Sequence, residues 1–171
     1  QKLINSFENE FIFENEPINR FKTFLKKDET NNDDKNKKLL ELKKKINSIE
    51  NCNLKINSKN LVFGDGNINS SIMLVGESPG TKEDASGQTF QGDVGTLLNK
   101  MLKAIDINKE DIYITYSVNF RPPDDRKPTS TEIKRYSVFL KEHISIINPK
   151  IIVLMGSSAM EAVTGISEKI T

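Results

Sequence analysis

The sequence predicts an α/β fold built on a parallel sheet, and three observations support this prediction. Two continuous apolar runs, residues 71–76 and 150–156, have the composition of strands that are buried on both faces. Residues 111–118 form a third predicted strand. Apolar residues at helical spacing occupy both intervals between these strands. Such an alternation of strands and helices is typical of α/β proteins with a parallel sheet.

Residues 1–60 precede this alternation, and we expect them to form an N-terminal helical segment. The apolar residues scattered through residues 1–27 allow one or two helices without a fixed register. Residues 26–38 contain no apolar side chain, so we interpret them as a polar linker or as the frayed start of a helix. Leucine and isoleucine then recur at helical spacing over residues 39–49, which predicts a lysine-rich amphipathic helix that ends near Asn51.

Residues 61–171 are predicted to form the α/β domain itself. A short strand and a Gly-Asp-Gly turn come first, within residues 61–67. One helix is expected over residues 94–105, between the predicted strands at 71–76 and 111–118. A second is expected over residues 131–147, before the strand at 150–156. A closing helix is expected over residues 157–165, because a serine can cap its start and a glycine can end it.

The composition says more about the cellular compartment of the protein than about its function. The chain holds 25 Lys and Arg residues against 24 Asp and Glu residues, and this balance neither indicates nor excludes a nucleic-acid partner. Cys52 is the only cysteine, so an intramolecular disulfide and an all-cysteine metal site are excluded. No apolar run reaches the roughly 18 residues of a membrane span. We therefore expect a cytoplasmic protein that does not bind a membrane.

The loop after the first buried strand, residues 76–92 (GESPGTKEDASGQTFQG), is the candidate site. It leaves the carboxyl edge of the predicted sheet, where ligands bind in open α/β folds. Gly76 and Gly80 allow a sharp turn and the close approach of a ligand, and Pro79 stiffens that turn. The Gly-Lys-Ser/Thr ending of a phosphate-binding Walker loop is missing. On spacing alone, a tight turn without special chemistry is the alternative.

Residues 61–165 resemble the family-four uracil-DNA glycosylases. GESPGTKED matches the family's GEAPGxxED, and GQTFQGDVGTLL matches its G-R-P-F-V-G-x-A-G-x-L-L. DIYITYSVNFRPPDDRKPT then matches D-V-Y-I-T-N-x-V-K-C-R-P-P-x-N-R-x-P-T. The resemblance implies a three-layer α/β/α fold with a central parallel sheet. It also implies an enzyme of base excision repair that hydrolyses the N-glycosidic bond of uracil in DNA.

The resemblance further implies roles for individual residues. A DNA glycosylase flips its target base out of the helix into a pocket. Glu77 would orient water or stabilise the cationic sugar, and Phe90 would stack on the uracil. The turn that would hold the uracil O2 as it becomes anionic consists of Gly76, Ser78, Pro79 and Gly80. The alternatives are that Glu77 is a solvated loop carboxylate and that Phe90 is a core residue.

The same resemblance implies contacts to DNA from the loop that follows the predicted strand at residues 111–118. Arg121, which two prolines follow, would touch a phosphate or brace the loop. Arg126 and Lys127 would add to a basic rim. Acidic residues lie among these side chains in the sequence, so an ordinary solvated face is the alternative.

Two departures from the family concern its cofactor and its base reader. Family four carries four cysteines that ligate an iron–sulfur cluster, and the matching positions here are Ile49, Cys52, Phe120 and either Tyr136 or its neighbour. Only one of them is a cysteine, so we expect no cofactor. The family's uracil-reading Asn is replaced by Tyr116, which either fills or reshapes the base pocket or is an ordinary amphipathic residue at a strand end.

A third departure is that the family's His-Pro motif would fall beyond Thr171. We therefore expect the chain to be truncated at the C-terminus. The only histidine, His143, lies in a predicted helix and is assigned to the surface. Two hypotheses follow: an active glycosylase for uracil or another damaged base, and an inactive or weak homologue that acts as a DNA-binding or protein-interaction module. A small nucleotide-binding protein has little support without a phosphate motif.

Overall fold

The computed structural model describes residues 29–167, with side chains from Asn32 onward. The described residues from 32 to 167 belong to one compact unit. The helices predicted within residues 1–27 lie outside the described residues, as do residues 168–171. In the part of the chain that is described, no helix is long and apolar enough to cross a membrane.

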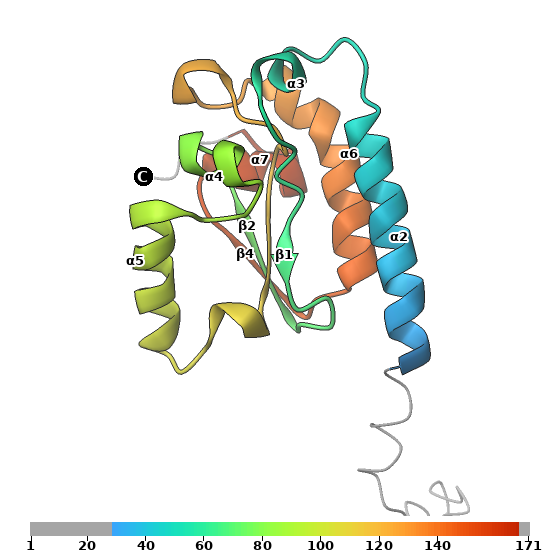
Figure 1. Ribbon diagram of the computed structural model, residues 1–171, viewed down its shortest axis with the longest axis vertical. Coiled ribbons are helices and arrows are strands. Elements are labelled where there is room, and N and C mark those ends of the chain that lie inside the picture. Colours follow the sequence, from blue (N-terminus) through green and yellow to red (C-terminus); the bar gives the residue numbers. More distant parts are fainter. Residues whose placement is uncertain (1–28, 168–171) are drawn as a thin grey trace, which may run out of the picture. The chain divides into compact units, whose positions relative to one another are not determined.

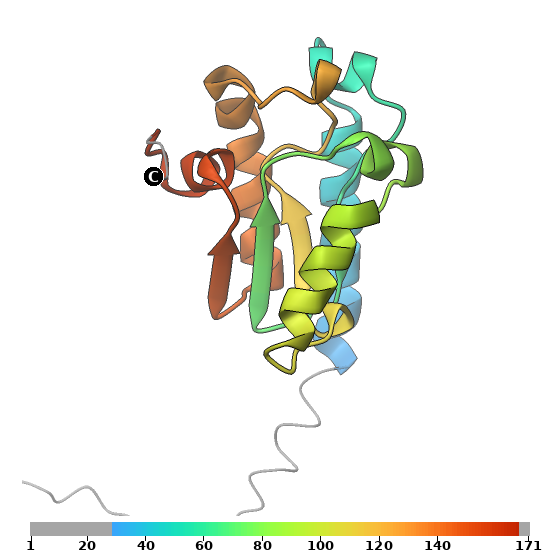
Figure 2. The same cartoon turned by 90° about the vertical axis from the view of Figure 1, so that its left-hand side faces the viewer.

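Four strands form one sheet in the order β1-β3-β2-β4. They are β1 (Asp65–Gly66), β2 (Ile72–Gly76), β3 (Tyr113–Tyr116) and β4 (Ile151–Leu154). β2 pairs in parallel with β3 on one side and with β4 on the other, whereas β1 is antiparallel to β3. The three main predicted strands are thus present, and their carboxyl ends meet at one edge (Figure 2). The expected strand before the Gly-Asp-Gly turn is absent from the described sheet, because the turn residues themselves pair with β3.

Helices cover both faces of this sheet, which confirms the α/β/α arrangement (Figure 1). The helices are α2 (Glu29–Asn47), α3 (Asn53–Asn57), α4 (Thr81–Ser86), α5 (Gly92–Lys103), α6 (Ser130–Ile147) and α7 (Ser157–Thr164), with 3-10 turns η1 (Lys109–Asp111) and η2 (Pro123–Asp125). α2, α6 and α7 pack on one face. α5 packs on the other, and it covers β2 and β3. β4 is not buried on both faces as predicted, since Ile151 and Val153 are exposed on the α5 side of this edge strand.

The predicted polar linker proves to be helical where it is described. α2 begins at Glu29, so residues 29–38 form the first half of a helix and the linker interpretation is wrong for them. Lys35 anchors this half, because its ammonium group donates to the backbone carbonyls of Ile68 (3.2 Å) and Ile147 (3.0 Å). Further along, α2 buries leucine and isoleucine side chains in the same core as β2 and α6. Residues 32–60 belong to the same compact unit as the described residues that follow them.

The prediction that His143 lies at the surface is wrong. Its side chain is 1% exposed and stacks on Phe63 with ring centroids 4.5 Å apart. A hydrogen bond of 2.8 Å joins its Nε2 to the Tyr113 hydroxyl. In α6, residue 143 follows the buried Tyr136 and Leu140 at helical spacing, so it shares their inward face. Burial lowers the pKa of His143 to about 3.

Candidate active site

A cavity of about 300 Å³ lies where β2 and β3 end. Its lining residues are Gly76, Glu77, Ser78, Gly80, Glu83, Phe90, Val94, Tyr116 and Met155. Six of these are site residues that the sequence predicted, and they come from the end of β2, the segment between β2 and α5, and the end of β3. The structure therefore brings most of the predicted site together in one cavity. Pro79 lies in the same loop but is not among the lining residues.

Position 76 has room only for glycine, because the rings of Tyr116 and Phe90 lie against it. A Cβ atom at this position would lie 2.7 Å from the Tyr116 ring and 2.9 Å from the tip of the Phe90 ring. Both distances are shorter than real Cβ contacts, so any side chain here would force the rings to move. The sequence predicted close approach of a ligand at this position; the structure shows close approach of two side chains of the protein itself.

Glu77 is fixed through one carboxylate oxygen. Its Oε1 accepts hydrogen bonds from the Ser158 backbone N–H (3.2 Å) and the Ser158 hydroxyl (3.0 Å) in the first turn of α7. The Ser157 hydroxyl (3.5 Å) and the Lys127 ammonium group (3.8 Å) also approach Oε1. A carboxylate at a helix N-terminus is stabilised by the free N–H groups there. In the described part of the chain, no hydrogen bond to Oε2 is recorded, which leaves this oxygen able to accept from water.

Glu83 joins the two halves of the candidate loop, which sequence reasoning did not foresee. Its Oε2 accepts from the Gly80 N–H (3.0 Å), and its Oε1 accepts from the Gln91 N–H (2.7 Å). The next residue, Asp84, accepts from the backbone N–H groups of Lys59 (2.9 Å) and Asn60 (3.1 Å). Both carboxylates are buried. The spacing of Gly80 and Glu83 could have indicated the first of these contacts, because an acidic residue three positions after the start of a helix often caps it.

A second pair of charged residues holds Thr89, next to Phe90. Asp65 accepts from the Thr89 N–H (2.9 Å) and the Thr89 hydroxyl (2.8 Å), and the Lys109 ammonium group donates to the Thr89 carbonyl (2.9 Å). These contacts help to keep Phe90 in a left-handed backbone conformation with φ of 46°. Asp65 belongs to the Gly-Asp-Gly turn. The sequence pattern of this turn did not indicate that it takes part in the site.

Phe90 and Tyr116 form a stacked pair at the floor of the cavity. Their ring centroids are 5.1 Å apart with planes inclined by 19°. The Tyr116 hydroxyl accepts a hydrogen bond from the Phe90 N–H (3.0 Å). Burial raises the pKa of Tyr116 above its ordinary value, so the phenol is neutral.

All three predicted DNA-binding residues lie within ion-pair distance of an acidic side chain. Arg121 makes a two-pronged ion pair with Asp125 (2.7 and 2.9 Å). Arg126 makes the same kind of pair with Glu132 (2.9 and 2.8 Å), and this contact lowers the pKa of Glu132 to about 2. Lys127 is largely exposed and lies 3.8 Å from the Glu77 carboxylate. Contact with DNA stays a prediction for all three residues.

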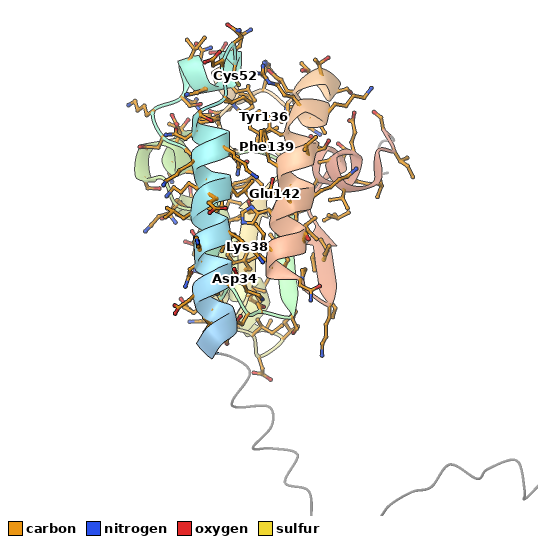
Figure 3. The ribbon with its side chains drawn as sticks, turned by 90° about the vertical axis from the view of Figure 1, so that its right-hand side faces the viewer. Asp34, Lys38, Cys52, Tyr136, Phe139 and Glu142 are labelled. Atoms are coloured by element: carbon orange, nitrogen blue, oxygen red, sulfur yellow. The ribbon has the colours of Figure 1, made fainter. Side chains whose placement is uncertain are left out.

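The four positions that match the family's cluster ligands lie together, but their side chains do not fit an iron–sulfur cluster. Cys52 and Tyr136 are joined by a 3.2 Å contact between the thiol and the hydroxyl, between α3 and α6 (Figure 3). The Phe120 ring meets the Tyr136 ring edge to face at 6.5 Å, and Ile49 packs against the same group. One thiol among apolar and aromatic side chains cannot supply four ligands. Among the described residues, no group of three or more His, Cys, Asp or Glu side chains is placed to hold a metal ion.

Comparison with known proteins finds a matching family model and several similar proteins. A family model described as the uracil DNA glycosylase superfamily matches residues 63–170. The type-4 uracil-DNA glycosylase of Thermotoga maritima is 43% identical over 109 residues, which are 64% of this chain and 57% of that protein. Those of Archaeoglobus fulgidus and Sulfurisphaera tokodaii are 38% and 40% identical, over 69% of this chain and 59% and 54% of their own lengths. The chain thus spans little more than half the length of these relatives.

Proposed function

The chain belongs to the uracil-DNA glycosylase superfamily, and we propose that the protein hydrolyses the N-glycosidic bond of uracil, or of another damaged base, in DNA. The observation that carries this proposal is the cavity at the carboxyl edge of the sheet, because Glu77 and Phe90 both line it. Its volume of about 300 Å³ is at the lower end of small-molecule sites and suits a single flipped base.

The proposed reaction breaks the bond between C1′ of the deoxyribose and N1 of the uracil. The electron pair of that bond leaves with the base, and water supplies a hydroxyl group to C1′ and a proton to the uracil. The products are a free base and an abasic site. Positive charge develops on the sugar and negative charge on the uracil oxygens, so a fixed carboxylate and fixed N–H groups both stabilise the transition state.

Glu77 is the proposed catalytic residue. The α7 N-terminus holds Oε1, so the carboxylate is oriented before a substrate arrives. Oε2 then accepts a hydrogen bond from the attacking water, and the negative charge of the carboxylate stabilises the cationic sugar. A general base or an electrostatic stabiliser of this kind contributes roughly 10²- to 10⁴-fold to the rate.

Ser78 is the proposed donor to the uracil O2. The Gly80 N–H is already occupied by the Glu83 carboxylate, so it is not available to the base. In the part of the chain that is described, the Ser78 N–H has no recorded acceptor, and Ser78 lines the cavity. The structure thus supports a narrower role for the Gly76 to Gly80 turn than the sequence predicted.

DNA is the proposed partner, and base excision repair in the cytoplasm is the proposed setting. Lys127 is the best placed of the three basic residues, because its ammonium group is exposed and lies 3.8 Å from the carboxylate of Glu77, which lines the cavity. Arg121 and Arg126 act through the loop that they brace with Asp125 and Glu132. Replacement of Lys127 by Gln should weaken DNA binding and reduce its salt dependence by about one counterion.

The test is an assay of the full-length protein on an oligonucleotide that contains one uracil. Alkali-sensitive abasic sites should form, and Glu77→Gln should slow their formation by roughly 10²- to 10⁴-fold. Glu110→Gln is the matched control, because Glu110 is an exposed acid outside this cavity. Equal rates for Glu77→Gln and the wild-type protein would show that Glu77 is not catalytic.

A second candidate function is that of a weak or inactive homologue that binds DNA. The specific observation in its favour is that Tyr116 covers the ring of Phe90, where a base would stack. This candidate predicts salt-dependent binding to DNA without abasic sites. A gel-shift measurement beside the cleavage assay separates the two functions.

A further inference from the structure

The stacking partner of Phe90 is supplied by the protein itself. Phe90 is 7% exposed and Tyr116 is 4% exposed, although both line the cavity. Their rings lie nearly parallel, with centroids 5.1 Å apart. A flipped base needs one free face of an aromatic ring on which to stack. On Phe90 the face at stacking distance is covered by the phenol of Tyr116.

Tyr116 is held in this position from three sides. Its hydroxyl accepts the Phe90 N–H, so the two residues are joined through both ring face and backbone. On the other side, Gly76 leaves room for the Tyr116 ring, which any Cβ would have to displace. β3 fixes the backbone of Tyr116, because its terminal pairing with Gly76 of β2 sets where the side chain starts.

The phenol also matches a pyrimidine in shape and polarity. Both are flat six-membered rings, and both present an oxygen atom that accepts a hydrogen bond from a backbone N–H. Tyr116 therefore covers one face of the Phe90 ring and accepts the hydrogen bond of the Phe90 N–H. Both groups would otherwise be open to a bound base.

We propose that Tyr116 occupies the base position on Phe90, so that its side chain and a flipped uracil compete for the same place and Tyr116 controls entry of the base. The proposal rests on the proposed function, since it takes Phe90 as the surface on which the base stacks. For uracil to bind, the Tyr116 ring must rotate away, which breaks the hydrogen bond to Phe90 and the ring stack. The apparent affinity then equals the intrinsic affinity multiplied by the fraction of molecules in which the ring is displaced.

This competition predicts which kinetic constant Tyr116 affects. At saturating substrate the ring is displaced in every molecule, so kcat changes little when Tyr116 is removed. KM falls instead, because less of the binding energy is spent on displacing the ring. One ring stack and one hydrogen bond correspond to a decrease in KM of about 10- to 100-fold.

The experiment compares the full-length wild-type protein with Tyr116→Ala, Tyr116→Asn and Tyr116→Phe. Tyr136→Phe is the matched control, because it removes a buried tyrosine hydroxyl on the opposite side of the sheet from the cavity. Excision kinetics are measured on a uracil oligonucleotide, and binding of free uracil is measured by saturation-transfer NMR. Circular dichroism checks that each variant is folded.

Tyr116→Ala and Tyr116→Asn should bind free uracil more tightly than the wild type and should lower KM. Tyr116→Phe should give a smaller gain, since it loses the hydrogen bond but keeps the ring. If the wild type excises uracil and the folded Ala and Asn variants show no lower KM, Tyr116 does not compete with the base and the proposed function stands. If neither the wild type nor any folded variant binds or excises uracil, both proposals are wrong.

Discussion

The loop that carries Glu77 is held by carboxylates, whereas the region around Tyr136 is held by packed rings and aliphatic side chains. In the loop, Glu83 and Asp84 bind backbone N–H groups of segments that would otherwise separate. The Tyr136 side chain itself makes a thiol–hydroxyl contact with Cys52 and an edge-to-face contact with Phe120, and it lies in an apolar cluster. The neighbouring Arg135 adds hydrogen bonds to the carbonyls of Glu50 and Asn51.

This difference shows how one chain can keep one region of a family and replace another. Glycines and carboxylates of the loop fix backbone amides in place, and no apolar side chain can accept from an N–H group. The cluster that the resemblance implies for the family would, in contrast, tie together the chain segments that match those around Cys52 and Tyr136. Packed side chains can do the same through burial of apolar surface. The predictions below test whether the two regions differ in this way.

The largest expected effect is the loss of the Tyr136 ring. Tyr136 is 1% exposed, and it joins α6 to Cys52 and Phe120. Replacement by Ala should lower the free energy of unfolding by about 3–5 kcal/mol, as a buried aromatic side chain is lost and a cavity remains. Val138→Ala is the control on the same helix, because Val138 is 65% exposed. Urea denaturation measures both; an equal effect of the two variants would show that the aromatic packing does not hold this region.

Glu83→Gln tests the loop in the same way and should have the next largest effect. A glutamine side chain presents an NH₂ group where one of the two backbone N–H groups needs an acceptor, so one contact is lost and a repulsion appears. The expected loss is about 1.5–3 kcal/mol, the range for hydrogen bonds to charged groups. Lower amide-exchange protection at Gly80 and Gln91 should accompany it. Unchanged protection would mean that Glu83 does not join the two halves of the loop.

The sequence pattern predicted an α/β fold and the place of the site, because apolar runs and glycine turns report local structure directly. The family resemblance implied the three-layer α/β/α arrangement. The sequence left open whether residues 29–38 are a linker or the start of a helix, since the contacts that hold this helix come from Ile68 and Ile147, far along the chain. The buried position of His143 was missed because a single polar residue on an apolar helix face carries no sign of its partner. The stack of Tyr116 on Phe90 was also hidden, as it depends on Gly76 leaving space between two segments.

His143 gives a pH test that involves neither region. Its pKa is about 3 in the folded protein and about 6.5 when unfolded, so between these values only the unfolded chain binds the proton. Stability is therefore complete above pH 6.5 and falls as the pH is lowered towards 3. The expected slope is at most about 1.4 kcal/mol per pH unit. Urea denaturation between pH 7 and 5 should show this slope in the wild type. His143→Gln should remove it, and persistence of the slope in that variant would assign it to other groups.

The smallest expected effect concerns the contact between Cys52 and Tyr136. Tyr136→Phe keeps the ring and removes only the hydroxyl, which lies 3.2 Å from the thiol. Because sulfur is a weak hydrogen-bonding partner, the loss should be about 0.5–1 kcal/mol. A double-mutant cycle with Cys52→Ala isolates the pair, and its coupling energy should fall in the same range. If the side chains alone hold this region, the melting temperature should also be the same for protein produced with and without iron. An iron-dependent melting temperature would instead show that the region still relies on a bound metal.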